Sequence, residues 1–124
     1  MNQRPLTSHH LSGIVPLQES IKKMGAAELT CLLKEAVKQS GLDVMADVAV
    51  DFAPHGASAV VVLKESHAAV HIWPEHESAT IDIHVCDYMS DNLSKARLLA
   101  QALSQSLSGH SRQEHCRWNE LTMQ

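Results

Sequence analysis

The sequence predicts an α+β protein, a two-layer sandwich in which an antiparallel sheet of about four strands carries two helices on one face. Two segments, 26–40 and 92–107, place apolar residues at helical spacing. The region between them contains β-rich runs joined by turns too short for a crossover helix, which favours antiparallel pairing. The whole chain, 1–124, has the length of a single domain with a modest core.

The first elements form an alternation of strand, helix and strand. A short strand is expected at 9–17, although Gly13 and Pro16 are unfavourable inside a strand. The segment 26–40 is predicted as a helix, because its apolar residues recur on one helical face, at positions 29, 32, 33, 36 and 37. The run VMADVAV at 44–50 is typical of a strand.

The central segment predicts three more strands joined by turns. A turn at 54–57 leads into the β-branched run 57–63, which suits a buried strand. Four polar residues at 64–67 then interrupt the apolar pattern, and their ordinary interpretation is a hairpin turn. The run AAVHIW at 68–73 is the next strand, and ATIDIHV at 79–85 alternates as a strand with one buried face does.

The C-terminal part predicts a second helix and a tail. The helix is expected over 92–107 and closed by Gly109, whereas the tail 110–124 is polar and weakly patterned. A chain this short leaves the other face of the sheet without a layer of its own. We therefore expect a second copy of the chain to cover it, in a homodimer.

Charge and hydropathy exclude several classes of protein. The formal net charge is −4 and no basic run occurs, which argues against nucleic-acid binding. No apolar stretch reaches the roughly 20 residues that cross a bilayer, and the first ten residues lack a signal-peptide core. We expect no membrane partner and a cytoplasmic location, with Cys31, Cys86 and Cys116 as reduced thiols.

Nine histidines raise the alternative of a metal-binding module. His67 and His71 are four positions apart, a spacing that suits zinc on a helix. On a strand, side chains four positions apart share a face but lie about 13 Å apart, too far for one ion. No metal site is therefore predicted.

The segment 56–86 carries the clearest functional pattern. It combines a glycine-x-serine turn, a valine-rich strand, a Glu-Ser-His motif, a His-x-Trp-Pro-Glu motif and a strand that ends in cysteine. In identity and spacing these elements resemble the core of the prokaryotic S-adenosylmethionine decarboxylases, and the rest of the chain is similar more loosely. The residues that carry the resemblance are Gly56, Ser58, Val60 to Leu63, Glu65, Ser66, His67, His71, Ile72, Trp73, Pro74, Glu75 and Cys86.

The resemblance implies an enzyme that cleaves itself between Glu65 and Ser66. In this family the serine hydroxyl attacks the preceding carbonyl, and elimination then leaves a pyruvoyl group in place of the serine. The products here would be a β chain, 1–65, and an α chain, 66–124. The substrate amine forms a Schiff base with the pyruvoyl group, which then accepts the electrons that decarboxylation releases. No dissociable cofactor is implied, and the expected product is the aminopropyl donor for spermidine.

The same resemblance implies roles for three further side chains. Ser58 assists the first acyl shift, and His71 removes the α-proton of residue 66 during elimination. A histidine suits this role because its ordinary pKa of about 6.5 lies near cell pH. Cys86 returns a proton to the substrate, and a thiol with an ordinary pKa of about 8.5 is mostly protonated at neutral pH, as a donor must be.

Three residues are expected to bind the substrate. The resemblance implies that Phe52, the only phenylalanine in the chain, stacks on adenine and that Glu75 contacts the nucleoside. Trp73 lies two positions after His71 on the predicted strand, so both side chains should face the same side.

Several positions near the expected pocket depart from the family pattern. Where the family has Tyr-Gly-Tyr after Trp-Pro-Glu, this chain has His76, Glu77 and Ser78, and Asp87 replaces the glycine that follows the cysteine. The self-processing residues are intact. Two alternatives therefore stay open: the same pyruvoyl chemistry on ornithine or arginine, whose distal cation Glu75 or Glu77 would bind, or an inactive homologue.

Overall fold

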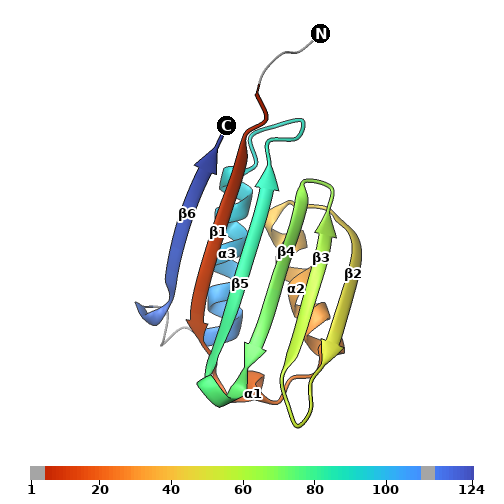
Figure 1. Cartoon of the computed structure of the whole chain (residues 1–124), viewed down its shortest axis with the longest axis vertical. Helices are drawn as coiled ribbons and strands as arrows, with labels where there is room; N and C mark the ends of the chain where they lie inside the picture. Colours follow the sequence, from red (N-terminus) through yellow and green to blue (C-terminus); the bar gives the residue numbers. More distant parts are fainter. Residues whose placement is uncertain (1–4, 110–113) are drawn as a thin grey trace.

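The protein folds as a two-layer α+β sandwich in the computed structural model, which describes residues 5–109 and 114–124 (Figure 1). One antiparallel sheet has the strand order β2-β3-β4-β5-β1-β6, and the helices α2 and α3 lie on one of its faces. The elements in chain order are β1 (Ser8–Pro16), α1 (Glu19–Lys22), α2 (Ala26–Ser40), β2 (Val44–Asp51), β3 (Ala57–Leu63), β4 (Ser66–Trp73), the 3-10 turn η1 (Pro74–His76), β5 (Ser78–Cys86), α3 (Leu93–Ser108) and β6 (Arg117–Met123).

The predicted fold class is confirmed, but the expected number of strands is wrong, since the described residues form a sheet of six. Five of the six strands occupy segments that the sequence pattern assigned to strands, and the sixth, the edge strand β6, lies in the tail that it left unassigned. Residues 110–113 of that tail lie outside the described residues. Gly13 explains why β6 can pair with β1. A Cβ atom at Gly13 would lie 2.6 Å from the Trp118 ring, so only glycine leaves room for the indole. The Trp118 N–H donates a hydrogen bond to Ser104 of α3 at 2.8 Å.

The core between the sheet and the helices is almost entirely aliphatic. Alternate residues of the strands meet one face each of α2 and α3, as the sequence periodicity predicted. Gly41 ends α2 in the left-handed conformation, with φ 88°. None of the described helices is long and apolar enough to span a membrane. The largest fully buried side chains are Val15, Leu17, Leu29, Leu33, Val37, Val61, Val70, Ile81, Ile83, Leu99, Leu103 and Leu107.

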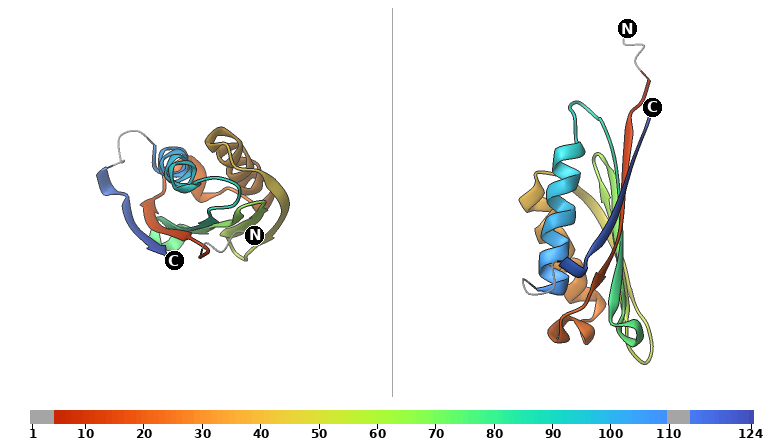
Figure 2. Two further views of the ribbon diagram at one scale, coloured as in Figure 1. Left: turned by 90° about the horizontal axis from the view of Figure 1, so that it is seen from above. Right: turned by 90° about the vertical axis from the view of Figure 1, so that its left-hand side faces the viewer.

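The opposite face of the sheet is not covered by any described helix (Figure 2). This exposed face carries many large apolar side chains; Val48 is 63 % exposed and Val62 is 49 % exposed. Such a broad apolar surface is characteristic of an interaction site. The apolar residues that the strand register assigns to this face are Ile14, Val48, Val50, Val62, Trp73, Leu121 and Met123.

Candidate active site

The predicted cleavage site lies at the tight turn between β3 and β4. Leu63 pairs with Ser66, so Lys64 and Glu65 form a two-residue hairpin turn, as the ordinary interpretation of this motif requires. Glu65 is only 8 % exposed. Its carboxylate accepts a hydrogen bond from the backbone N–H of Asp43 at 3.3 Å. The peptide bond before Ser66 is therefore held in place from one side by the Glu65 side chain.

The backbone carbonyl group of Glu65, which the serine would attack, has a hydrogen-bond donor. Its oxygen accepts a hydrogen bond from the backbone N–H of Cys86 at 2.9 Å, which ties the turn to the end of β5. If a nucleophile added to this carbonyl, the same N–H would lie against the developing negative charge. A fixed donor of this kind is the basic element of an oxyanion hole.

Ser66 itself has an unusual backbone conformation. Its φ of 155° lies in a region that is strongly disfavoured for residues with a side chain, and strain of this kind is concentrated at functional sites. The hydroxyl turns toward the exposed face of the sheet. There Oγ lies 3.0 Å from Nδ1 of His84 and 3.4 Å from Nδ1 of His67.

Three histidines form a row across the exposed face beside Ser66. The strand register pairs His10 of β1 with His84 of β5, and His84 with His67 of β4. The rings of His10 and His84 stack with centroids 4.0 Å apart, and His67 meets His84 edge-on at 5.2 Å. Partial burial lowers the pKa of His84, and the positive charges that His10 and His67 can carry lower it further. On the far side of its ring, Nε2 of His84 lies 3.8 Å from Sγ of Cys86.

We call this group the junction end of the exposed face: Glu65, Ser66, His67, His84, His10 and Cys86. It brings together Ser66 and Cys86, for which the resemblance implies catalytic roles. It also contains His84 and His10, which were not predicted as site residues. Strand alternation had placed His84 on the polar face of β5, but only the register with β1 and β4 shows which groups it meets.

The remaining predicted residues gather at the other end of the same face, which we call the pocket end: Phe52, Ser58, His71, Trp73 and Glu75. Ser58 and His71 pair across β3 and β4, and their side chains are joined by a hydrogen bond of 2.7 Å between Oγ and Nδ1. All five residues line one hollow of about 600 Å³. Phe52 and Trp73 remain about half exposed in it, so two aromatic surfaces are open to a ligand.

The geometry of Trp73 confirms that it faces the same side of β4 as His71. The two ring centroids are 6.4 Å apart, and the indole N–H donates to Thr80 Oγ1 at 3.0 Å. Because this hydrogen bond fixes the indole, Trp73 is a rigid wall of the hollow.

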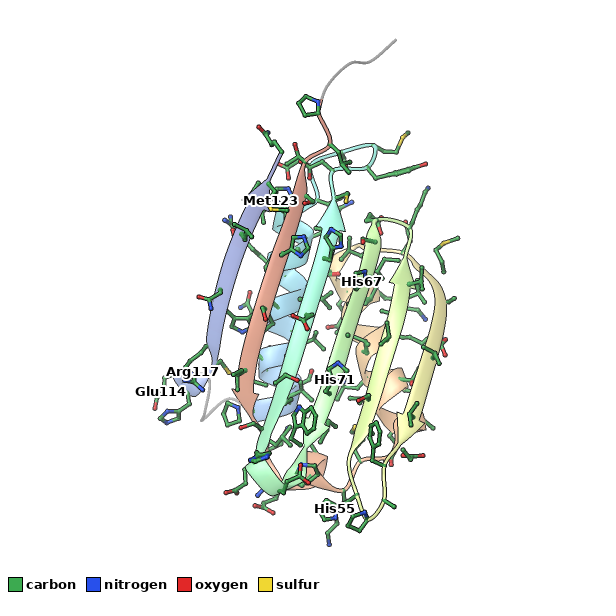
Figure 3. The ribbon with its side chains drawn as sticks, in the orientation of Figure 1. His55, His67, His71, Glu114, Arg117 and Met123 are labelled. Carbon is green, nitrogen blue, oxygen red and sulfur yellow. The ribbon has the colours of Figure 1, made fainter. Side chains whose placement is uncertain are left out.

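The two ends are too far apart to react with each other within one chain. Ser66 and His71 are five positions apart on β4, and a strand of that length spans about 17 Å. Figure 3 shows His67 and His71 at well-separated levels of the same strand. His71 therefore cannot reach the α-proton of residue 66 in its own chain, and the roles predicted for it and for Ser58 require a second chain.

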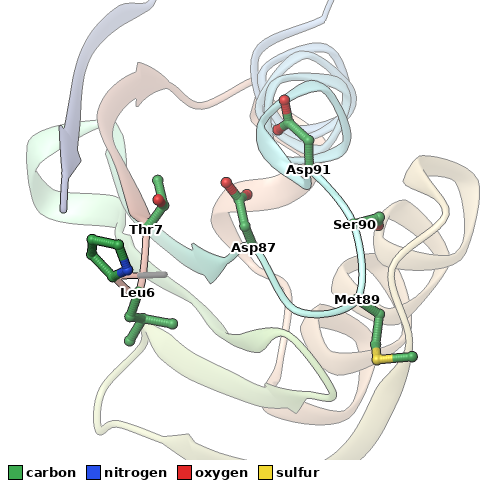
Figure 4. Close-up of a pocket in the computed structure, with 7 residues that line it drawn as sticks. Leu6, Thr7, Asp87, Met89, Ser90 and Asp91 are labelled. Atoms are coloured by element: carbon green, nitrogen blue, oxygen red, sulfur yellow. The ribbon is translucent and has the colours of Figure 1, made fainter. Parts of the chain in front are cut away.

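Two other features of the molecule have the form of a ligand site. A hollow of about 550 Å³ lies beyond the end of β5, between the N-terminal segment at Leu6 and Thr7 and the loop that begins at Asp87 (Figure 4). Within the described ranges, His9, Asp87 and Asp91 form the group whose ligand-type atoms lie close enough together to hold a metal. Both ring nitrogens of His9 are already engaged, with Thr122 at 2.8 Å and Asp87 at 2.9 Å, so this group is a structural tie between strands.

Comparisons with known proteins bear on the family and on the fold. A family model described as S-adenosylmethionine decarboxylase matches residues 17–113. Proteins named S-adenosylmethionine decarboxylase proenzyme are similar: that of Persephonella marina is 47 % identical over 44 % of this chain and 41 % of its own length, and that of Hydrogenobaculum sp. is 31 % identical over 70 % of this chain and 72 % of its own. The matched segment thus spans about two fifths of the former protein. The crystal structure of the adenosylmethionine decarboxylase from Aquifex aeolicus is similar with a TM-score of 0.72 and 28 % identity, covering 95 % of this chain and 88 % of that one.

Proposed function

Because the chain belongs to the S-adenosylmethionine decarboxylase family, we propose that it breaks its own 65–66 peptide bond and then decarboxylates S-adenosylmethionine. The observation that carries the proposal is the geometry of that bond. Its carbonyl oxygen is hydrogen-bonded to the Cys86 N–H, and the residue that follows is a serine in a strained conformation. The name proenzyme, which the relatives bear, is consistent with such a processing step.

Processing would convert Ser66 to a pyruvoyl group at the start of the chain 66–124. This group supplies an electrophilic carbonyl that accepts the electrons released as carbon dioxide leaves, which no unmodified side chain can do. The residues around Ser66 suit it, because they form a partly buried, polar environment on an otherwise apolar face. Cys86 lies beside this position and is the candidate donor that returns a proton to the substrate. This role requires a free thiol and so favours a cytoplasmic location.

The site is completed by a second copy of the chain. The exposed face has the apolar character of an interface, and stacking it on an identical face would bury it. A two-fold axis that runs between the two sheets, across the strands, would bring the junction end of each copy opposite the pocket end of the other. The partner's Ser58 and the partner's His71 would then lie beside Ser66. A homodimer of cleaved protomers, with two sites, follows from this arrangement.

The pocket end suits the nucleoside part of S-adenosylmethionine. An adenine ring can stack on Phe52, and each stacked base contributes about 1–3 kcal/mol. Trp73 forms a second apolar wall, and the Glu75 carboxylate can accept hydrogen bonds from ribose hydroxyls.

The alternative substrates, ornithine and arginine, are less well served. They would need a carboxylate for their distal cation. Of the two carboxylates that could bind this cation, Glu77 is already bound to Lys22 at 2.6 Å, which leaves Glu75 alone in the hollow. Glu77 also has a φ of 53°, a left-handed conformation that glycine adopts freely, and the family has glycine there. The turn thus accommodates the glutamate that stands in place of glycine, and the Glu77 side chain is directed to Lys22.

The test is the intact mass of the purified protein followed by a decarboxylation assay. We expect two fragments, 1–65 and 66–124, with the second shortened by conversion of its first residue to pyruvoyl. Release of carbon dioxide from S-adenosylmethionine should be far faster than from ornithine or arginine. Ser66→Ala should give one uncleaved, inactive chain. A wild-type chain that stays whole under all conditions would contradict the proposal, and a cleaved chain inactive on all three substrates would contradict the assigned reaction.

A further inference from the structure

His84 lies between the two reacting groups of the junction end, yet the chemistry described so far gives it no role. Its Nδ1 atom is 3.0 Å from the Ser66 hydroxyl, and its Nε2 atom is 3.8 Å from the Cys86 thiol. Stacking on His10 fixes the plane of the ring. A side chain held in this position by two neighbouring strands is well placed to move a proton.

We propose that His84 is the base that takes the Ser66 hydroxyl proton when the 65–66 bond begins to break. The inference rests on the proposed function, since it adds a residue to the same site. Two histidine nitrogens lie near Ser66 Oγ, and the His84 contact is the shorter, 3.0 Å against 3.4 Å for His67. A general base must lie within about 2.6–3.2 Å of the atom that it deprotonates, and only His84 of this pair meets that condition.

The protonation state of His84 suits the role. Nδ1 can accept a proton only while the imidazole ring is neutral. The lowered pKa of His84 keeps the ring neutral at pH 7. The groups that face it are His10 from β1, His67 from β4, and Asp82 and Cys86 on its own strand. With Nδ1 accepting from Ser66, the ring proton lies on Nε2, which faces the Cys86 sulfur.

The step is balanced without any further reactant. Ser66 Oγ forms a bond to the Glu65 carbonyl carbon while its proton passes to Nδ1 of His84. The carbonyl π electrons move to the oxygen, which the Cys86 N–H stabilises. When the carbonyl re-forms, the carbon–nitrogen bond breaks. The nitrogen of residue 66 then takes the proton from His84 and leaves as an amine, so the peptide bond has become an ester.

The role ends with processing. Elimination transfers the Ser66 oxygen to the new Glu65 carboxylate, so Nδ1 loses its partner once the chain is cleaved. Loss of the base should therefore slow self-cleavage more than it slows decarboxylation by chains that are already cleaved.

The experiment follows self-cleavage of the full chain by intact mass, with hydroxylamine added in parallel to trap the ester, because hydroxylamine cleaves esters and leaves peptide bonds intact. His84→Asn places an amide oxygen near the position of Nδ1, so it keeps a hydrogen-bond acceptor but cannot take a proton. We expect both cleavage and ester trapping to slow on the order of 100-fold. His115→Asn, at an exposed site far from the junction, is the matched control and should process at the wild-type rate.

A second variant separates a chemical role from a structural one. His84→Ala removes the ring, and added imidazole should restore a large part of the cleavage rate, whereas it should not accelerate the wild type. Circular dichroism should show both variants folded, since His84 lies on the exposed face and not in the core.

Three results would overturn the inference while leaving the proposed function intact. The first is wild-type cleavage by His84→Asn, which would show that a hydrogen bond is enough. The second is a larger loss in His67→Asn than in His84→Asn, which would assign the base to His67. The third is a slow His84→Ala that imidazole does not accelerate. A wild-type chain that never cleaves would instead remove the proposed function, and this inference with it.

Discussion

The junction end and the pocket end lie on one face of one sheet, but they are built in different ways. At the junction end, backbone N–H groups hold Glu65 from two sides, and packed histidine rings surround Ser66. At the pocket end, Phe52 and Trp73 stand about half exposed around an open hollow. In the proposed function, the first acts on the chain itself and the second receives the substrate. Since each holds only part of the predicted catalytic set, the working unit that we propose is a pair of chains.

The strongest test of this division is a complementation experiment. Ser66→Ala damages only the junction end and His71→Ala only the pocket end, so each variant expressed alone should fail to complete cleavage and should be inactive. Co-expressed, the two form a mixed dimer with one intact site, in which the Ser66 of one chain meets the partner's His71. We expect about half of the His71→Ala chains to be cleaved if pairing is random. Intact mass of the mixture measures it.

The control for this experiment is mixing of the two variants after separate purification under conditions that prevent exchange. Absence of any cleaved chain in the co-expressed mixture would show that both ends act within one chain. The two ends would then have to come together by a rearrangement of the sheet.

A second test separates the two tasks of the junction end. Cys86→Ser keeps the backbone N–H that holds the Glu65 carbonyl, so self-cleavage should proceed. A hydroxyl is a much weaker acid than a thiol, so decarboxylation should fall on the order of 100-fold. Cys31→Ser is the matched control, because this thiol is exposed and remote from the site, and it should change neither rate. Loss of cleavage in Cys86→Ser would mean that the thiol itself takes part in processing.

Most residues of the two ends were identified from the sequence, but their arrangement in space was not. The spacing of Ser58, Ser66, His71 and Cys86 led to the family, and periodicity located both long helices. Local pattern could not show that Ser66 and His71 are out of reach of each other, because their separation depends on both lying on one continuous strand. The roles implied for Ser58 and His71 remain predictions.

The missed elements have a common cause, which is contact between segments distant in the chain. Gly13 weakened the prediction of the first strand because the indole that fills its empty space comes from Trp118, about a hundred positions later. His84 gained importance only from strand pairing with His10 and His67. Neither feature leaves a signal within a window of neighbouring residues.

Substrate binding at the pocket end should weaken when one of its aromatic rings is removed. Phe52→Ala removes the platform proposed for adenine, and the KM for S-adenosylmethionine should rise about 10-fold or more. Self-cleavage should keep its rate, because neither the acyl shift nor the elimination as proposed uses the Phe52 ring. Leu98→Ala on α3 is a suitable control, since Leu98 has a similar exposed fraction, 52 % against 54 % for Phe52. An unchanged KM would exclude stacking on Phe52 and reopen the choice of substrate.

The smallest expected effect is the pH dependence that His84 gives to the free energy of unfolding. The pKa of His84 is lowered in the folded chain and returns to about 6.5 on unfolding. Below about pH 6.5 the unfolded chain therefore binds more protons than the folded chain, so the free energy of unfolding falls as pH decreases through this value. Above it, His84 is neutral in both states and contributes no pH dependence.

Urea unfolding of the uncleaved Ser66→Ala chain at about pH 7.5 and about pH 5.5 would measure this effect. The urea midpoint should drop on acidification, and adding His84→Asn should reduce the drop, whereas adding His115→Asn should leave it unchanged. Equal drops with and without His84 would mean that the acid sensitivity arises elsewhere. A reduced drop would instead show that the partial burial of His84 and its crowding by His10 and His67 cost stability in acid. The same two causes keep His84 neutral at the pH where we propose that the chain processes itself.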